Sequence, residues 1–166
     1  MISAKVVKTY STFKPGVFRQ EMHAAALVLM ANMTKDFNKT TRTWQHNVDF
    51  DGKVQDKLDE ISVQVSTKDE IYGYVDKGTK PHIIKPRRGK LLAFKNRYKA
   101  KTTPRVINSH KGGASGKTVY AKVVHHPGTD AREFSHLIQA KYQPRLKKDI
   151  EAAITRAARR SGHATK

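Results

Sequence analysis

The segment from Lys77 to Thr129 constrains the fold of this chain more than any other feature. It carries 14 Lys or Arg and no Asp or Glu, so every acid in the protein lies outside it. The basic side chains within the segment therefore have no internal partner for an ion pair, and an unpaired charge is costly to bury. We expect the segment to keep its cations at a surface, facing solvent, a polyanion or carboxylates from elsewhere.

The charge of the whole chain supports the same expectation. Its 166 residues include 33 Lys or Arg and 14 Asp or Glu, which gives a net charge of +19. This imbalance exceeds what solubility requires, and self-repulsion disfavours a compact state. We therefore expect a polyanionic partner: nucleic acid first, an acidic protein surface second and anionic lipid third. A chain of this length is expected to form one domain over residues 1–166.

Absent sequence features narrow the class of protein further. The chain has no cysteine, which excludes disulfides and cysteine-ligated zinc and favours a reducing compartment. The longest apolar run, Ala24–Ala31, is too short to span a bilayer, and no signal peptide is visible. We therefore expect a soluble protein of intracellular origin with no membrane partner.

Apolar periodicity predicts a long helix towards each end of the chain. Over 15–44 the apolar residues recur at three- and four-residue steps, and Pro15 suits a first helical turn. A similar pattern runs from Ala131 to Arg160, with a break or kink expected at Pro144. The first apolar face comprises Phe18, Met22, Ala25, Ala26, Leu29, Met33 and Phe37. The second comprises Phe134, Leu137, Ile138, Tyr142, Leu146, Ile150, Ile154 and Ala157.

Short strands are expected between the two long helices. Residues 46–52 and 60–66 alternate polar and apolar side chains, which is typical of paired strands, with Asp51 and Gly52 helping their turn. Three further short apolar runs predict strands at 82–86, 90–94 and 118–124.

The middle of the chain also holds a short helix and a long basic stretch. The helix is expected over 68–79, with Asp69 favouring its N-terminus and Gly78 following its last turn. Residues 96–117 lack periodicity, so we expect a mobile basic loop there, and a frayed basic tail at 160–166. Together these elements predict an α+β fold. An antiparallel or mixed sheet would be packed by the long N-terminal helix and the C-terminal helix.

Two motifs that could carry chemistry are weak. A phosphate-binding loop needs four residues between its first Gly and its Gly-Lys pair, whereas three separate Gly112 from Gly116, so we interpret GGASGKT as a flexible hinge. His125 and His126 would point to opposite sides of an extended chain and do not readily chelate one ion. A small metal-dependent enzyme is therefore the weakest hypothesis, and we expect no catalytic, metal-binding or cofactor-binding residue.

A nucleic-acid function would depend on charge rather than on base recognition. Tyr98 is the one aromatic residue within 96–117, which is too few for a stacking platform, and no zinc-finger, basic-zipper or RNA-recognition motif is present. Such charge predicts salt-sensitive, sequence-independent binding. The residues expected to contact DNA or an acidic partner are Arg87, Arg88, Lys90, Arg97, Lys99, Lys101, Arg105, Lys111 and Lys117.

Three sequence blocks stand in a fixed order along the chain. They are YGYVDKGTKPHIIKPRRGKLLAF at 72–94, TVYAKVVHHPGT at 118–129, and Phe134 followed by the long helix. This order resembles the tail-completion or neck proteins of long-tailed bacteriophages. Members of this family are often labelled minor tail components, and they share an HPGT motif. Two departures are Glu133, where the family commonly has Pro, and the long basic loop between the blocks. The matching residues are Gly78, Thr79, Pro86, Lys90, Leu92, Phe94, Lys122, His126, Pro127, Gly128, Thr129 and Phe134.

The resemblance implies a structural virion protein without enzymatic activity or cofactor. It implies an α+β subunit that assembles with itself into a ring, expected to be a hexamer, in the phage neck. The ring would complete the tail and help to join it to the DNA-filled head. Its neighbours would be a head-completion or connector protein and a tail terminator or tube protein, with genomic double-stranded DNA as a further contact in the lumen. Assembly would take place in the cytoplasm of the bacterial host. The alternative is a non-specific nucleic-acid-binding protein that uses the acid-free segment 77–129.

Overall fold

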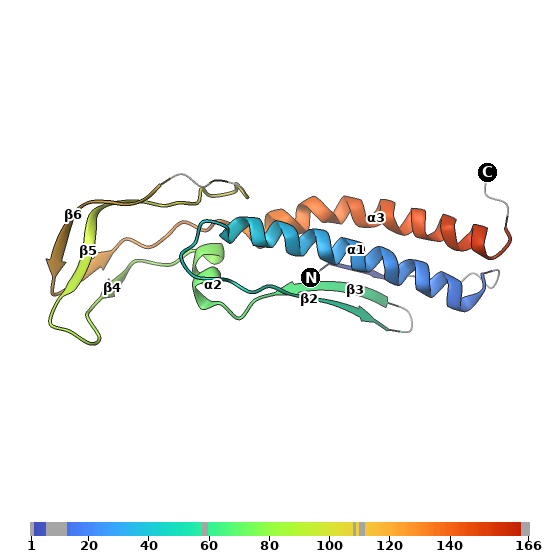
Figure 1. Ribbon diagram of the computed structural model, residues 1–166, viewed down its shortest axis with the longest axis horizontal. Helices are drawn as coiled ribbons and strands as arrows, with labels where there is room; N and C mark the ends of the chain where they lie inside the picture. Colours follow the sequence, from blue (N-terminus) through green and yellow to red (C-terminus); the bar gives the residue numbers. More distant parts are fainter. Residues whose placement is uncertain (1, 6–12, 58–59, 108, 110–111, 164–166) are drawn as a thin grey trace. The chain divides into compact units, whose positions relative to one another are not determined.

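The computed structural model describes residues 2–5, 13–57, 60–107, 109 and 112–163 (Figure 1). Within these ranges the chain forms helices and antiparallel strands, which confirms the α+β class. In chain order the elements are β1 (Ile2–Lys5), α1 (Pro15–Thr41), β2 (Asp51–Asp56), β3 (Glu60–Ser66), α2 (Glu70–Lys77), β4 (His82–Ile84), β5 (Leu92–Lys99), β6 (Gly113–Ala121), β7 (Val124–His126) and α3 (Phe134–Arg160).

The chain divides into two compact units, a division that the single-domain expectation did not anticipate. The helical unit comprises Met1–Asn38, Asp49–Thr67 and His136–Lys166, and the strand unit comprises Lys39–Val48 and Lys68–Ser135. The helical unit holds the three-stranded sheet of order β1-β3-β2, whereas the strand unit holds two separate two-stranded ladders, β4-β7 and β5-β6. No helix in the described part of the chain is both long enough and apolar enough to cross a membrane.

The core of the helical unit confirms the expected apolar faces. On α1, Met22, Leu29 and Met33 are buried, and their spacing follows the predicted helical period. On α3, Ile138 and Ala157 are fully buried. Figure 1 shows α1 and α3 running side by side along β2 and β3. The sheet and the two helices therefore share one apolar interior.

The prediction for the first strand of this sheet is partly wrong. Residues 46–50 form no strand, and β2 begins at Asp51, so Asp51 and Gly52 lie in the strand and not in its turn. A Cβ atom on Gly52 would lie 2.9 Å from the Cγ atom of Met30 on α1. Gly52 is therefore explained by the close approach of a helix to the strand, a packing requirement that looks like a turn signal in the sequence.

The third helix runs through Pro144 without the expected break. It is assigned as one helix from Phe134 to Arg160, so Pro144 does not open a second segment. Pro144 is exposed, which lets water satisfy the carbonyl that the missing N–H leaves unpaired. Burial of the apolar face on both sides of the proline keeps the helix continuous.

A buried polar cluster links α1 to α3 within the helical unit. The carboxylate of Asp36 is buried, and it accepts hydrogen bonds from the Lys141 ammonium and from the Tyr142 hydroxyl, the latter at 3.0 Å. The Tyr142 hydroxyl also lies 3.0 Å from the Asn32 carbonyl oxygen. Burial, followed by the hydrogen bond to Asp36, raises the pKa of Tyr142 to about 12. The cluster supplies the buried carboxylate with a cation and a donor.

Two irregular segments expected from the sequence are more ordered than predicted. Residues 96–99 belong to β5 and residues 113–117 to β6, so the 96–117 loop prediction is wrong over those stretches. Their periodicity was hidden because both faces of this hairpin are largely exposed and need no apolar alternation. At the C-terminus, Ser161 and His163 donate backbone hydrogen bonds into the last turn of α3, while 164–166 lie outside the described residues.

Candidate interaction surface

Two Gly-Thr pairs from distant sequence blocks meet in the strand unit. Thr79 N donates to Thr129 O at 2.9 Å, and Thr129 N donates to Thr79 O at 3.1 Å. The chain between them therefore leaves and returns at one hydrogen-bonded bridge. We call residues 80–128 the arm and the Thr79–Thr129 bridge its base.

Glycine is required on both sides of this base. Gly78 has a φ of 76° and Gly128 a φ of 93°, conformations that other residues rarely adopt. A Cβ atom at Gly78 would lie 2.6 Å from Thr129 O, and one at Gly128 would lie 2.3 Å from Thr79 O. Both distances are too short for a side chain. The two Gly-Thr pairs thus serve a single backbone crossing.

The paired histidines contribute to this architecture. Gly128 N donates to His126 Nδ1 at 3.0 Å, so the His126 side chain holds the turn that follows β7. His126 lies opposite His82 in the β4-β7 ladder, and their ring centroids are 4.9 Å apart. His125 instead pairs with Ile83, so the adjacent histidines lie on opposite faces of the strand. In the described part of the chain, no three His, Asp or Glu side chains gather closely enough to hold a metal ion.

An aromatic cluster that includes the first residue of α3 packs at the base of the arm. Phe134 is 0% exposed and is the first residue of α3, as its place in the motif predicts. Its ring centroid lies 6.4 Å from that of Tyr72, which in turn lies 6.1 Å from Trp44. Burial, with a smaller effect of Asp76, raises the pKa of the Tyr72 hydroxyl well above its ordinary value. This cluster gives the base of the arm its own small core.

The start of α3 differs from the sequence expectation. The helix begins at Phe134 and not near Ala131. Asp76 accepts a hydrogen bond from Ser135 N at 3.0 Å, so a residue of α2 satisfies a backbone donor at the start of α3. Glu133 has a φ of 56°, which the proline common in the family could not adopt. A proline at this position would therefore require a different backbone conformation.

A buried arginine anchors the connection between β5 and β6. Arg132 is 5% exposed, and it donates from Nε to the Thr102 hydroxyl at 3.1 Å and from Nη1 to the Asp130 carbonyl at 2.8 Å. Arg105 N donates to Arg132 O at 3.1 Å, and Arg105 Nε pairs with Glu133 at 3.1 Å. These bonds fix one end of the β5-β6 hairpin to the segment that precedes α3.

The structure divides the nine cations expected to contact a partner. Lys101 and Arg105 are held within the chain, since Lys101 Nζ donates to Thr43 O at 3.1 Å and Arg105 pairs with Glu133. Lys111 lies outside the described residues. The remaining six are exposed: Arg87, Arg88 and Lys90 in the connection from β4 to β5, Arg97 and Lys99 on β5, and Lys117 on β6. In Figure 1 the 85–91 connection lies at the end of the strand unit that is far from α2.

The other motif residues line the arm without forming a core. Phe94 leaves 41% of its surface exposed, so it does not anchor the strand as a buried aromatic would. Pro86 and Leu92 are half-buried, and Leu92 pairs with Ala121 across the hairpin. Lys90, Lys122 and Pro127 are exposed. The arm therefore presents most of its side chains to solvent.

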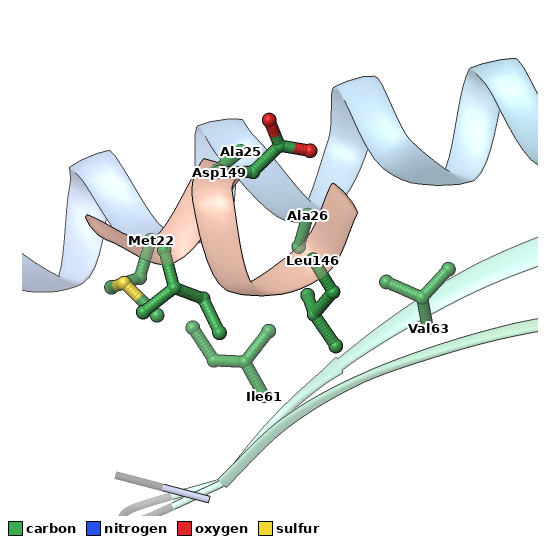
Figure 2. Close-up of a pocket in the computed structure, with 8 residues that line it drawn as sticks. Met22, Ala25, Ala26, Ile61, Val63, Leu146 and Asp149 are labelled. Carbon is green, nitrogen blue, oxygen red and sulfur yellow. The ribbon is translucent and has the colours of Figure 1, made fainter. Parts of the chain in front are cut away.

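The described part of the helical unit contains an apolar hollow that is too small for a ligand. Figure 2 shows an apolar hollow lined by α1, β3 and α3, with Met22, Ile61 and Val63 on its walls. Its volume of about 10 Å³ admits no more than a single water molecule. The Asp149 carboxylate points away from Ile61 and Val63 in Figure 2. The hollow is a packing defect and not a binding pocket.

Sequence reasoning missed the residues that hold the arm in place. Arg132 and Asp76 were not among the predicted residues, and Arg105 and Lys101 were predicted to contact a partner. One available signal was the position of Asp76, which is the last acid before the acid-free segment. The burial of Arg132 has no signal in a single sequence, because it depends on Thr102 lying opposite. No family model matches this chain, and neither curated proteins nor solved structures gave a match.

Proposed function

We propose that this protein is a ring-forming structural subunit of the neck of a long-tailed bacteriophage. It would complete the tail and help to join it to the DNA-filled head, and it would act without catalysis. The observation that carries the proposal is the convergence of the motif blocks. Gly78, Thr79, Gly128 and Thr129 form one backbone crossing, and the arm that starts there carries no carboxylate.

The arm supports a role in assembly for a physical reason. A subunit of a closed ring repeats two different surfaces around an axis and also meets the rings above and below it. An arm with exposed cations and exposed apolar side chains offers such a surface. A lumen lined only with these cations would hold DNA back during ejection, so we assign at least part of the charge to protein contacts.

Electron microscopy of particles made without this protein tests the proposal. We expect separate DNA-filled heads and finished tails in its absence, and complete particles when the protein is supplied. Mass photometry of the purified protein with its neighbouring ring proteins should give an assembly of defined mass. Complete infectious particles in the absence of this chain, or a strict monomer that binds no neck protein, would overturn the proposal.

The exposed cations also favour a second candidate, a protein that binds duplex DNA without sequence preference. A two-stranded ribbon such as β5-β6 fits the major groove, and phosphate contacts by Arg97, Lys99 and Lys117 would release counterions. This function predicts DNA affinity that falls steeply with salt in a gel-shift series. The triple variant R97Q/K99Q/K117Q should then bind much more weakly, and unchanged binding would exclude this candidate.

A further inference from the structure

We infer that the arm docks onto a protein surface that is both acidic and apolar, and that this surface belongs to a different chain. The inference deepens the proposed function and rests on it for its setting, a neighbouring ring. The chemistry of the partner, however, is argued from the surface of the arm itself.

The arm combines positive charge with exposed apolar surface. Residues 80–128 hold 13 Lys or Arg and no acid. Among these cations, Tyr98 is 69% exposed and Tyr120 is 67% exposed. The exposed large apolar side chains of the arm include Ile83, Leu91, Phe94, Tyr98, Tyr120 and Val123. An apolar group of this kind on a surface commonly marks a contact with another protein.

Both faces of the β5-β6 hairpin carry this combination. Residues directly opposite in an antiparallel pair share a face, so Phe94 lies with Val119 on one face and Tyr120 with Ala93 on the other. Each face therefore holds an exposed aromatic ring. On the Tyr120 face, Lys95 lies two residues from Ala93 and adds a cation.

The arm also has little internal packing to stabilise it. Its two ladders, β4-β7 and β5-β6, contain two strands each. A two-stranded hairpin without a covering layer is at best marginally stable in water. A partner that covers one or both faces would remove apolar surface from water and order the arm at the same time.

Duplex DNA does not satisfy this surface. Phosphates would pair with the cations, but the bases of a duplex are stacked and cannot accept the exposed aromatic rings. A second copy of this chain is also a poor match. Outside residues 77–129 the chain has 19 of its 33 Lys and Arg together with all 14 acids, so the remainder is itself positively charged. Charge complementarity therefore favours a different, acidic protein chain.

Binding measured by fluorescence anisotropy with three defined probes tests the inference. The probes are a short peptide of alternating Glu and Leu, a peptide of equal length and charge that alternates Glu and Ser, and a short DNA duplex. We expect the wild-type protein to bind the Glu-Leu peptide about tenfold more tightly than the Glu-Ser peptide, because apolar burial adds to the charge attraction. We also expect it to bind the Glu-Leu peptide more tightly than the duplex.

Variants separate the apolar and the ionic contributions. The double variant F94S/Y120S should lose about tenfold in affinity for the Glu-Leu peptide and little for the Glu-Ser peptide. V28S, which removes an exposed apolar side chain from α1, should change neither affinity and is the matched control. The triple variant R87Q/R88Q/K90Q should weaken binding of both peptides. Circular dichroism and thermal unfolding establish that each variant is folded.

Two results would overturn the inference. One is equal affinity for the two peptides, which would show that apolar contact contributes nothing. The other is tighter binding of the duplex that F94S/Y120S leaves unchanged, which would assign the arm to nucleic acid. Failure of this experiment is distinct from failure of the proposed function. If the protein is present in assembled necks but shows no preference for the Glu-Leu peptide, the inference alone is wrong. If the protein is absent from particles but shows this preference, only the proposed neck role is wrong.

Discussion

The helical unit and the arm use the same amino acids in opposite ways. In the helical unit, Leu29, Val63 and Ile138 are almost completely buried, and acids pair with bases: Glu21 lies within 2.6 Å of Arg156 and Asp56 within 2.9 Å of Arg19. In the arm, large apolar side chains are exposed and no acid is present to pair with 13 cations. The first region buries most of its large apolar side chains, whereas the second leaves most of its described cations and several large apolar side chains exposed.

This difference shows what each region contributes. The free energy of folding should come mainly from the helical unit, because buried apolar area is the dominant favourable term. The arm should depend on a few anchors at its base and contribute mainly to recognition. Substitutions can test this division by comparing their effects on stability in the two regions.

The largest effect is expected in the core of the helical unit. Ile138→Ala removes a fully buried side chain of α3 and should lower the free energy of unfolding by about 2–5 kcal/mol. The matched control, Ile83→Ala on the exposed side of β4, should cost less than about 1 kcal/mol. Urea unfolding followed by circular dichroism measures both. Equal losses would contradict the division between the two regions.

The next effect is expected at the base of the arm. Gly128→Ala places a Cβ atom 2.3 Å from Thr79 O in a backbone with a φ of 93°, so we expect a loss of about 3 kcal/mol that opens the base. Limited proteolysis should then cut within 80–128 much faster than in the wild type. Gly73→Ala, where a Cβ meets no atom within 4 Å, is the control and should not increase cleavage. A resistant Gly128→Ala protein would show that the bridge does not hold the arm.

A smaller effect is expected from the buried arginine. Arg132→Leu leaves the Thr102 hydroxyl and the Asp130 carbonyl without their donor, which should cost about 2 kcal/mol. Hydrogen exchange should increase for Arg105 N, which donates to the Arg132 carbonyl. Arg97→Leu, on the exposed surface of β5, should change stability by less than about 0.5 kcal/mol. Similar costs for both variants would remove the anchoring role of Arg132.

The smallest effect is expected from Tyr142 and depends on pH. Its pKa is raised from 10.0 to about 12 in the folded state, so its contribution is complete below pH 10 and is lost as the pH rises towards 12. Tyr142→Phe should cost about 1 kcal/mol at neutral pH and should flatten the fall in stability over that alkaline range. Unfolding series at several alkaline pH values, with tyrosinate absorbance as a second signal, measure this. An identical pH dependence in wild type and variant would refute the assignment.

The sequence predicted the elements wherever one face is buried. The apolar faces of α1 and α3, the strand at 60–66 and the helix capped by Asp69 followed from periodicity and capping rules. Residues 96–99 and 113–117 of the exposed hairpin were missed because a strand without a buried face has no alternation to detect. The predicted helix break at Pro144 was wrong, because an exposed proline within a well-packed helix is tolerated.

The candidate surface was predicted in outline but not in detail. The absence of acids marked the segment whose cations have no acid within it, since this property needs only counting. The separation of anchoring cations from free ones required the positions of Thr43, Thr102 and Glu133, which are distant in the sequence. The exposure of Phe94 and Tyr120 likewise depends on the absence of a covering layer, which no local pattern records.

The closed base has a consequence for how this protein can diversify. Because Thr79 and Thr129 are hydrogen-bonded neighbours, a short turn could join Thr79 to Gly128 and omit residues 80–127 entirely. Insertions and replacements between those two threonines need not disturb the helices on either side of them in the sequence. The arm is therefore exchangeable: a new contact surface could be transplanted at this one crossing while Gly78 and Gly128 stay fixed.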